Sequence, residues 1–282
     1  MIFHSDMHVH SFASRCCQDA RQTPENIVPL LAEHGYEKIG FVDHVWISKD
    51  VEPSYFYHLQ NGDRHIELLN FIRSCKWEIE VLVGCEADMQ APGVFGITPD
   101  FKEKMDFVVM ATDHFHMTNF VQQPEKKTPE CLGQHMLKFF ISAAQSGIPD
   151  ILVHPFFPYG YVDLYDKSIA SLSDTEILDA FGIAASNNIG IEINKCFLPN
   201  PQYERFFSLE TPLRILTLAK QAGCTFTIGS DAHNLGSFGV LDKLQALAKS
   251  LDLTEDDIHP LAKINKVKTV KKIKKFKKIK KD

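Results

Sequence analysis

Seven short apolar runs rich in β-branched residues recur along this chain, and polar residues follow each of them directly. The runs lie near residues 2–8, 38–43, 80–87, 106–112, 150–154, 189–194 and 225–230. Between them are longer segments whose apolar residues have largely helical spacing. Alternation of this kind is typical of a parallel α/β fold, and 282 residues suffice for one barrel-type domain.

The expected helices carry clear start and stop signals. Three of them have a threonine in the N-cap position and a proline in the first helical position. These pairs are Thr23-Pro24, Thr128-Pro129 and Thr211-Pro212. Glycines stand where the same helices should end and the next strand should approach, at Gly35, Gly147 and Gly223.

The residues that end the seven strands are mostly His, Asp and Glu. They are His8-Val9-His10, Val42-Asp43-His44, Gly84-Cys85-Glu86, Thr112-Asp113-His114-Phe115-His116, Val153-His154-Pro155, Glu192-Ile193-Asn194 and Ser230-Asp231-Ala232-His233. In a parallel barrel the C-terminal ends of all strands meet at one mouth. The sequence therefore predicts a metal site at that mouth.

The donor types indicate which metals the site would take. Histidine and carboxylate donors favour Zn²⁺, Mn²⁺ or iron over Ca²⁺ or an Fe–S cluster. The candidate ligands are His8, His10, His44, Glu86, His114, His154, Asp231 and His233. This set is too large for one tetrahedral ion, so we expect two or three divalent metal ions. Ions about 3.5–4 Å apart suit phosphate ester hydrolysis, because they share a bridging water and clamp the reacting oxygens.

The order of these motifs resembles the polymerase and histidinol phosphatase (PHP) family of metal-dependent phosphoesterases. The matching pieces are "DMHVHS", "FVDH", "GCEAD", "ATDHFH", "LVHP", "IEIN" and "GSDAH", covering residues 6 to about 240. The resemblance implies a distorted, TIM-like seven-stranded (β/α) barrel over residues 1–262, with a trinuclear metal centre at its C-terminal mouth. It also implies a hydrolase acting on phosphoric ester bonds, with a small phosphomonoester such as histidinol phosphate as the substrate.

The resemblance further implies roles for individual residues. One metal would be held by His8, His10, Glu86 and Asp231, a second by Glu86, His114 and His154, and a third by His44 and His233. Catalysis is expected to depend on Glu86, Asp231 and His233.

Two positions depart from the family pattern. Cys16 stands where the family often has a further histidine, and a thiolate is also a good zinc ligand, so Cys16 is a candidate ligand of the third metal. We expect the neighbouring Cys17 to point the other way along an extended segment. The fourth motif is one residue longer than usual, which makes His116 an alternative to His114. Amidohydrolases are a less favoured family, because they typically place a carboxylated lysine after the fourth strand.

Residues near the mouth are candidates for substrate binding. Arg15, Lys195 and Arg205 follow strands one and six and are the expected phosphate contacts. Two loops are rich in aromatic residues, namely Trp46, Tyr55, Phe56 and Tyr57 after the second strand, and Phe156, Phe157, Tyr159, Tyr161 and Tyr165 after the fifth. These rings either select a ring-bearing leaving group or pack the loops onto the barrel.

The charge of the chain is unevenly divided. Residues 263–282 form a Lys-rich tail with a charge of +10, whereas the rest of the chain carries −16. The acidic body disfavours a broad nucleic-acid-binding face, so nucleic acid is a less favoured partner that only the tail would recruit. Seven scattered cysteines and the lack of a long apolar run or leader favour a cytoplasmic protein without membrane contact.

Two other functions remain open at this point. One is a nuclease or nucleotide phosphatase of the same family, and the other is a metal-binding domain that has lost activity. The complete set of candidate ligands argues against the second.

Overall fold

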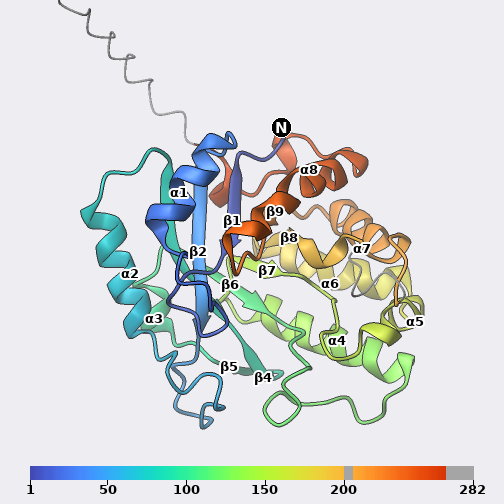
Figure 1. The fold of residues 1–282 in the computed structure, drawn as a ribbon. Helices are drawn as coiled ribbons and strands as arrows, with labels where there is room; N and C mark the ends of the chain where they lie inside the picture. Colours follow the sequence, from blue (N-terminus) through green and yellow to red (C-terminus); the bar gives the residue numbers. More distant parts are fainter. Residues whose placement is uncertain (200–205, 265–282) are drawn as a thin grey trace, which may run out of the picture.

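A computed structural model describes residues 1–199 and 206–264 of the chain. Its central feature is a sheet of seven parallel strands in the order β1-β2-β3-β6-β7-β8-β9 (Figure 1). Their bounds are β1 Ser5–Val9, β2 Lys38–Val45, β3 Glu80–Ala87, β6 Val108–Ala111, β7 Ile151–Val153, β8 Gly190–Asn194 and β9 Phe226–Gly229. The seven predicted strands are therefore confirmed, with ends that shift by at most three residues.

The first and last strands meet at a seam that nearly closes the sheet into a barrel. The backbone N–H of Asp231 donates to the carbonyl of His8 at 2.8 Å, and that of His10 donates to the carbonyl of Ala232 at 3.1 Å. A parallel bridge joins Val9 to Ala232. This closure confirms the predicted TIM-like barrel and places the ends of β1 and β9 side by side.

Helices cover the outside of the sheet (Figure 1). They are α1 Pro24–Glu33, α2 Asp63–Ser74, α3 Pro99–Lys102, α4 Pro129–Gln145, α5 Tyr165–Ala170, α6 Asp174–Ser186, α7 Glu210–Gln221 and α8 Leu241–Ser250. Short 3₁₀ turns occupy Val162–Leu164, Lys195–Phe197, Leu235–Val240, Glu255–Asp257 and Pro260–Ala262. None of the helices in the described part of the chain is long and apolar enough to cross a membrane.

Two of the three predicted helix starts are confirmed. Thr23 and Thr128 are the N-caps of α1 and α4, with proline in the first turn of each helix. The third prediction is wrong by two residues, because α7 begins at Glu210 and Thr211 therefore lies within its first turn. The three predicted stop glycines all have positive φ, from +69° to +84°, which is the conformation that glycine adopts most readily after a helix.

A small hairpin, β4 Met89–Ala91 and β5 Val94–Phe95, follows β3 and was not predicted. It forms a separate two-stranded sheet beside the barrel mouth. The strands of the barrel are buried on both faces, and every residue of β1, β2 and β8 is buried. This burial explains why these strands appear in the sequence as continuous apolar runs rather than as alternating patterns.

Candidate metal centre

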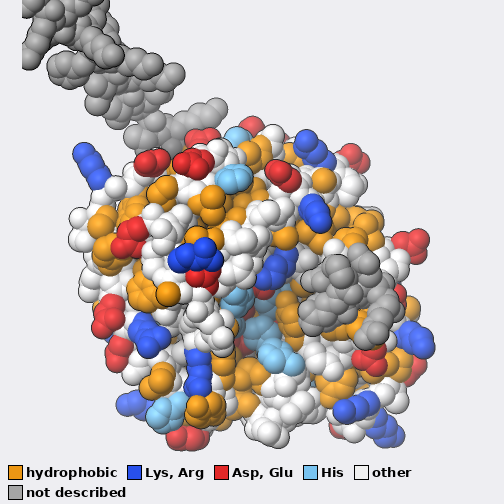
Figure 2. Space-filling model, in the orientation of Figure 1, with side chains coloured by type: hydrophobic (Ala, Val, Ile, Leu, Met, Phe, Trp, Pro, Cys, Tyr) orange, Lys and Arg blue, Asp and Glu red, His pale blue; other side chains and the backbone are white. Residues whose placement is uncertain are grey.

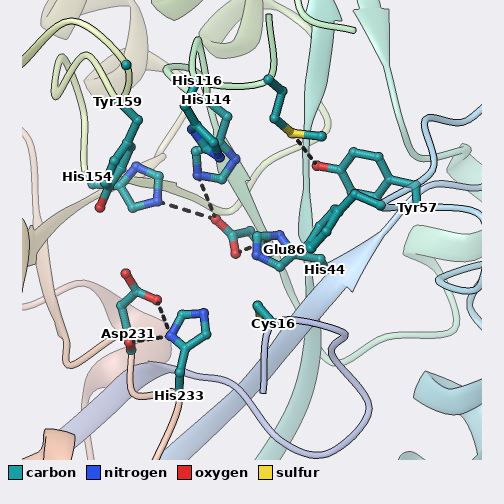
Figure 3. A pocket seen from close by; sticks show the side chains of 13 residues that line it. Cys16, His44, Tyr57, Glu86, His114, His116, His154, Tyr159, Asp231 and His233 are labelled. Carbon is teal, nitrogen blue, oxygen red and sulfur yellow. Dashed lines mark hydrogen bonds and ion pairs between the residues drawn. The ribbon is translucent and has the colours of Figure 1, made fainter. Parts of the chain in front are cut away.

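A cavity of about 540 Å³ opens at the C-terminal ends of the strands. Histidine side chains gather in this hollow on the face shown in Figure 2. Its lining residues are Cys16, His44, Phe56, Tyr57, Glu86, His114, His116, Met117, His154, Tyr159, Gly160, Asp231 and His233 (Figure 3). The polar strand ends of the sequence thus lie around one space, as expected for a parallel barrel.

Three groups of side chains in the described residues bring potential ligand atoms within 4.8 Å of one another. The groups are His8, His10 and Asp231, then Glu86, His114 and His154, and finally His10, Cys16, His44 and His233. Every residue predicted as a ligand belongs to one of the groups. Histidine, carboxylate and thiolate donors at this spacing fit divalent transition metals.

Glu86 lies at the centre of these groups and has the surroundings of a metal ligand. Its Oε2 atom lies 3.1 Å from His44 Nδ1, 3.3 Å from His10 Nε2 and 3.5 Å from His8 Nε2. Although it is buried, Oε2 has no hydrogen-bond partner. Oε1 faces His154 Nε2 at 3.3 Å. An unpartnered buried carboxylate oxygen that is ringed by imidazoles is costly without a cation, so the donor set fits a bound metal.

Two of the potential ligands have strained backbones. His154 has a φ of +34° and Asp231 has a φ of +47°, both in the left-handed region that non-glycine residues rarely adopt. Asp231 is buried and lies 3.2 Å from His10 Nε2 through Oδ1. Strain of this kind persists only where the surroundings impose it, and it clusters at functional sites.

Three buried carboxylates behind the imidazoles were not singled out by the sequence analysis. Glu192 lies 2.8 Å from His8 Nδ1, and Asp113 lies 2.9 Å from His154 Nδ1. The third is Asp88, which makes the corresponding contact to His114 Nδ1 at 2.5 Å. Each carboxylate occurs within a strand-end motif, and this was the available signal.

These contacts orient the rings. A carboxylate at Nδ1 fixes the imidazole and leaves Nε2 free for a metal, which is the usual arrangement behind metal-bound histidine. In agreement, the Nε2 atoms of His8 and His154 both face Glu86. Gly229 makes room for one of the carboxylates, because a Cβ atom there would overlap Glu192.

Charge pairing offsets the cost of burying this site. Burial alone would raise the pKa of Glu86, but positive charge on His44 and His8 holds it well below its usual value. Burial alone would lower the pKa of His8, but Glu192 and Glu86 raise it to about 10. His10 differs, since burial and the charge of His233 lower its pKa. In the metal-free protein, protonated imidazoles thus balance the carboxylates, and a metal would have to displace those protons.

Cys16 lies among three histidines, His10, His44 and His233. A hydrogen bond from Cys17 is the largest cause that lowers the pKa of the Cys16 thiol, and burial opposes it. The expectation that Cys17 points away along an extended segment is wrong. The chain turns here, with the Ser14 carbonyl accepting the N–H of Cys17, and the hydrogen bond between the two thiols places them side by side.

The structure distinguishes His114 from His116 as candidate ligands. His114 belongs to the group with Glu86 and His154, whereas His116 lines the cavity outside that group. Burial lowers the pKa of His116 to about 4, and the charge of His114 adds to the effect.

The candidate phosphate-binding residues have different surroundings. Arg15 does not line the cavity, because its Nη1 donates to the Tyr55 carbonyl at 2.7 Å and its guanidinium covers the Tyr55 ring. The ammonium of Lys195 donates to the Asp231 carbonyl and lies 3.5 Å from its carboxylate, at the edge of the site. Arg205 lies outside the described residues.

The aromatic loops divide between the two expected roles. Phe56, Tyr57 and Tyr159 line the cavity. By contrast, the rings of Phe156 and Tyr165 are buried in the hydrophobic core. The sequence could not separate these roles, because both loops carry several aromatic residues and no local pattern marks which rings face the cavity.

Comparisons with known proteins identify the family. A family model described as the PHP domain matches residues 6–196. A protein of Shewanella loihica named "Probable phosphatase" is 26% identical over 89% of this chain and 87% of its own length. A Deinococcus radiodurans protein named "Probable histidinol-phosphatase" is 23% identical over 83% of this chain and 88% of its own length.

A solved structure shares the fold. The histidinol phosphate phosphatase of Lactococcus lactis, described in complex with zinc, L-histidinol and phosphate, has a TM-score of 0.53 and 22% identity. The similarity covers 88% of this chain and 93% of that one. The names of these proteins agree with the predicted enzyme class, a hydrolase of phosphoester bonds. With two thirds of its length matched by the family model, the chain belongs to the PHP domain family.

Proposed function

We propose that the protein hydrolyses a small phosphomonoester at a centre of two or three divalent metal ions. The observation that carries this proposal is the buried Glu86 carboxylate, with imidazole nitrogens around both of its oxygens. The three groups of ligand atoms support a third ion beside the pair that Glu86 would bridge. The phosphatase names of the relatives support the reaction class.

The proposed ligands follow the three groups. His8, His10 and Asp231 with the adjacent Glu86 would hold one ion, Glu86, His114 and His154 a second, and Cys16, His44 and His233 a third. When bound, zinc, manganese or iron would activate a water and neutralise the phosphate charge.

The chain's own residues contribute position and charge. Glu86 at the end of β3 and Asp231 after β9 both contact His10 Nε2, at 3.3 and 3.2 Å, and so join the ligand groups across the barrel mouth. His233 lines the cavity with its Nδ1 directed to the Asp231 carbonyl at 2.9 Å, so its other nitrogen is available to ligate or to transfer a proton. Lys195, whose ammonium lies 3.5 Å from the Asp231 carboxylate at the edge of the site, is the proposed phosphate contact among the described cations.

Small substrates are favoured over long nucleic acid. The cavity of about 540 Å³ accommodates a phosphate with a modest leaving group. The −16 charge of the chain outside the Lys-rich tail opposes a polyanion. The seven free cysteines are consistent with a reducing compartment, and we propose the cytoplasm.

The test is a phosphate-release screen with protein reconstituted separately with Zn²⁺, Mn²⁺ and Fe²⁺. The panel contains histidinol phosphate, other phosphomonoesters, nucleotides and short oligonucleotides, and Glu86→Gln serves as the inactive control. Turnover of phosphomonoesters that is lost in Glu86→Gln is the expected result. Cleavage confined to oligonucleotides would replace the proposal with a nuclease, and no turnover with any metal would refute it.

A further inference from the structure

Tyr159 places a hydroxyl group at the metal centre that none of the roles above uses. It lies in the loop after β7 and lines the cavity. Its ring meets the His154 ring edge-on at 5.3 Å and an interplanar angle of 90°. In Figure 3 the hydroxyl points toward the space between His154 and Asp231. The hydroxyl is therefore directed to where a substrate phosphate would sit between the two ligand groups.

The loop that carries Tyr159 is held in a strained and tightly fixed conformation. Besides His154, Phe156 has a positive φ, at +63°. Buried Asp113 fixes both sides of this bend, because it contacts His154 Nδ1 and accepts the N–H of Phe157 at 3.2 Å. The N–H of Tyr159 donates to the Phe157 carbonyl at 2.9 Å. Strain that is maintained by several contacts indicates a preorganised functional element.

A close approach fixes the other side of the loop. Gly160 has a φ of +95°, and a Cβ atom there would lie 2.8 Å from the backbone nitrogen of His116. Glycine is thus required for the loop after β7 to pack against the loop after β6. The Tyr159 ring packs against His114 and His116 of the loop after β6, so its hydroxyl needs little reorganisation to bind a ligand.

The hydroxyl is a neutral donor in the metal-free protein. Burial raises the pKa of Tyr159 well above its usual value, and the nearby Cys196, Asp231, Asp113 and Glu86 add to the effect. Burial likewise keeps the Cys196 thiol protonated by raising its pKa. The Tyr159 hydroxyl donates to the Cys196 sulfur, and this contact opposes the rise in the Cys196 pKa. Sulfur is a weak acceptor, so a substrate phosphate oxygen would readily take over this donor.

The other described residues that line the cavity leave Tyr159 as the hydrogen-bond donor for a substrate phosphate. Neither Arg nor Lys is among the described residues that line it. The Tyr57 hydroxyl is directed to Met117 Sδ at 3.8 Å, and every cavity histidine except His116 is a proposed metal ligand. We propose that Tyr159 is a catalytic residue that donates a hydrogen bond to a non-bridging oxygen of the substrate phosphate. This inference rests on the proposed phosphomonoester hydrolysis.

The test compares Tyr159→Phe with Tyr161→Phe in the metal-loaded protein. Tyr161 is a matched control from the same loop, because its hydroxyl donates to Gln123 Oε1 at 2.8 Å and it does not line the cavity. Loss of one preorganised donor to a developing oxyanion typically lowers kcat by about 10²–10³-fold. We expect a fall at the lower end of this range in Tyr159→Phe, with unchanged metal content and a normal Tyr161→Phe.

Two substrates distinguish contact with the phosphate from protonation of the leaving group. A phosphate contact lowers kcat/KM equally for benzyl phosphate and 4-nitrophenyl phosphate, whose leaving groups differ greatly in basicity. A loss confined to benzyl phosphate would overturn the proposal in favour of a leaving-group acid. Unchanged rates in Tyr159→Phe, or equal losses in Tyr161→Phe, would also overturn it.

Phosphate binding separates this inference from the proposed function. Calorimetric titration of the metal-loaded proteins with inorganic phosphate should show weaker binding to Tyr159→Phe than to wild type or Tyr161→Phe. If the wild type hydrolysed no phosphomonoester but showed this difference, the proposed function would fail while the phosphate contact stood. Equal phosphate affinity in all three proteins would refute the contact itself.

Discussion

Replacement of Asp113 by Asn tests whether a carboxylate behind an imidazole controls the metal centre. Asp113 is buried and contacts His154 Nδ1 at 2.9 Å, while its second oxygen accepts the N–H of Phe157. Asn keeps the size of the side chain and one acceptor but removes the charge that orients His154. Loss of such a partner typically weakens metal binding about 10–100-fold. This range corresponds to about 1.4–2.7 kcal/mol, since 1.4 kcal/mol is tenfold.

Folding stability should change much less than metal affinity. Burial raises the pKa of Asp113, so the native structure bears a cost for the carboxylate that Asn removes. That relief offsets part of the lost hydrogen-bond energy of about 1.5–3 kcal/mol for a charged group. We therefore expect the free energy of unfolding of the metal-free protein to change by about 1 kcal/mol or less.

The assay is a competition for Zn²⁺ between the protein and a chromophoric chelator, with urea unfolding of the metal-free proteins beside it. Asp150→Asn is the matched control, because Asp150 accepts the N–H of Val108 at 2.8 Å from outside the candidate site. Unchanged zinc affinity in Asp113→Asn would refute the orienting role. An equal loss in Asp150→Asn would show that the effect is general destabilisation.

Four further predictions follow from the site and its surroundings. Elemental analysis should find two or more transition-metal ions per chain, and Glu86→Gln should lose metal and most turnover while its circular dichroism stays native; a single ion in active wild type would contradict the multinuclear centre. Cys16 should resist alkylation in the metal-loaded protein and react after chelation, whereas the exposed Cys75 should label equally in both states. His65 is buried and its pKa is lowered to about 4, so the folded protein binds fewer protons than the unfolded chain. The free energy of unfolding should therefore fall by up to about 3 kcal/mol as the pH drops from about 6.5 toward 4. Urea unfolding of metal-free His65→Gln should show a smaller fall over the same pH range. Deletion of residues 265–282 should leave phosphomonoester turnover nearly unchanged but weaken any nucleic-acid binding and reduce its salt dependence; salt-independent binding by the full chain would count against the tail as a polyanion contact.

Much of the fold and of the ligand set could be predicted because both follow from position along strands. Glu86 and Asp231 each end an apolar run, and parallel strands in a barrel bring such ends together whatever the loops between them do. The helix stops were predictable for a similar local reason, since Gly147 and Gly223 supply a positive φ that other residues disfavour.

The remaining features depend on distances that no local pattern encodes. Glu192 and Asp88 occur in motifs that were recognised, but their roles depend on which imidazole nitrogen they meet across the barrel. The contact between the thiols of Cys16 and Cys17 depends on a turn at residues 15 and 16. That turn contains no glycine or proline from which it could have been predicted. Tyr159 and Tyr165 differ in role only because one lines the cavity and the other packs in the core.

The position of the seam has a consequence for how the protein matures. The Ser230 hydroxyl donates to the His8 carbonyl and so joins residues 222 positions apart, and the ligand group of His8, His10 and Asp231 spans nearly the same gap. Translation at about 5–20 residues per second leaves the first two ligands without their third for roughly 10–45 s. The nascent chain therefore exposes an early pair of histidines that can take up a metal only weakly until β9 docks beside β1. Loading of this proposed metal group would thus be coupled to the last step of barrel closure, and a chain that stops short of β9 should emerge without the metal.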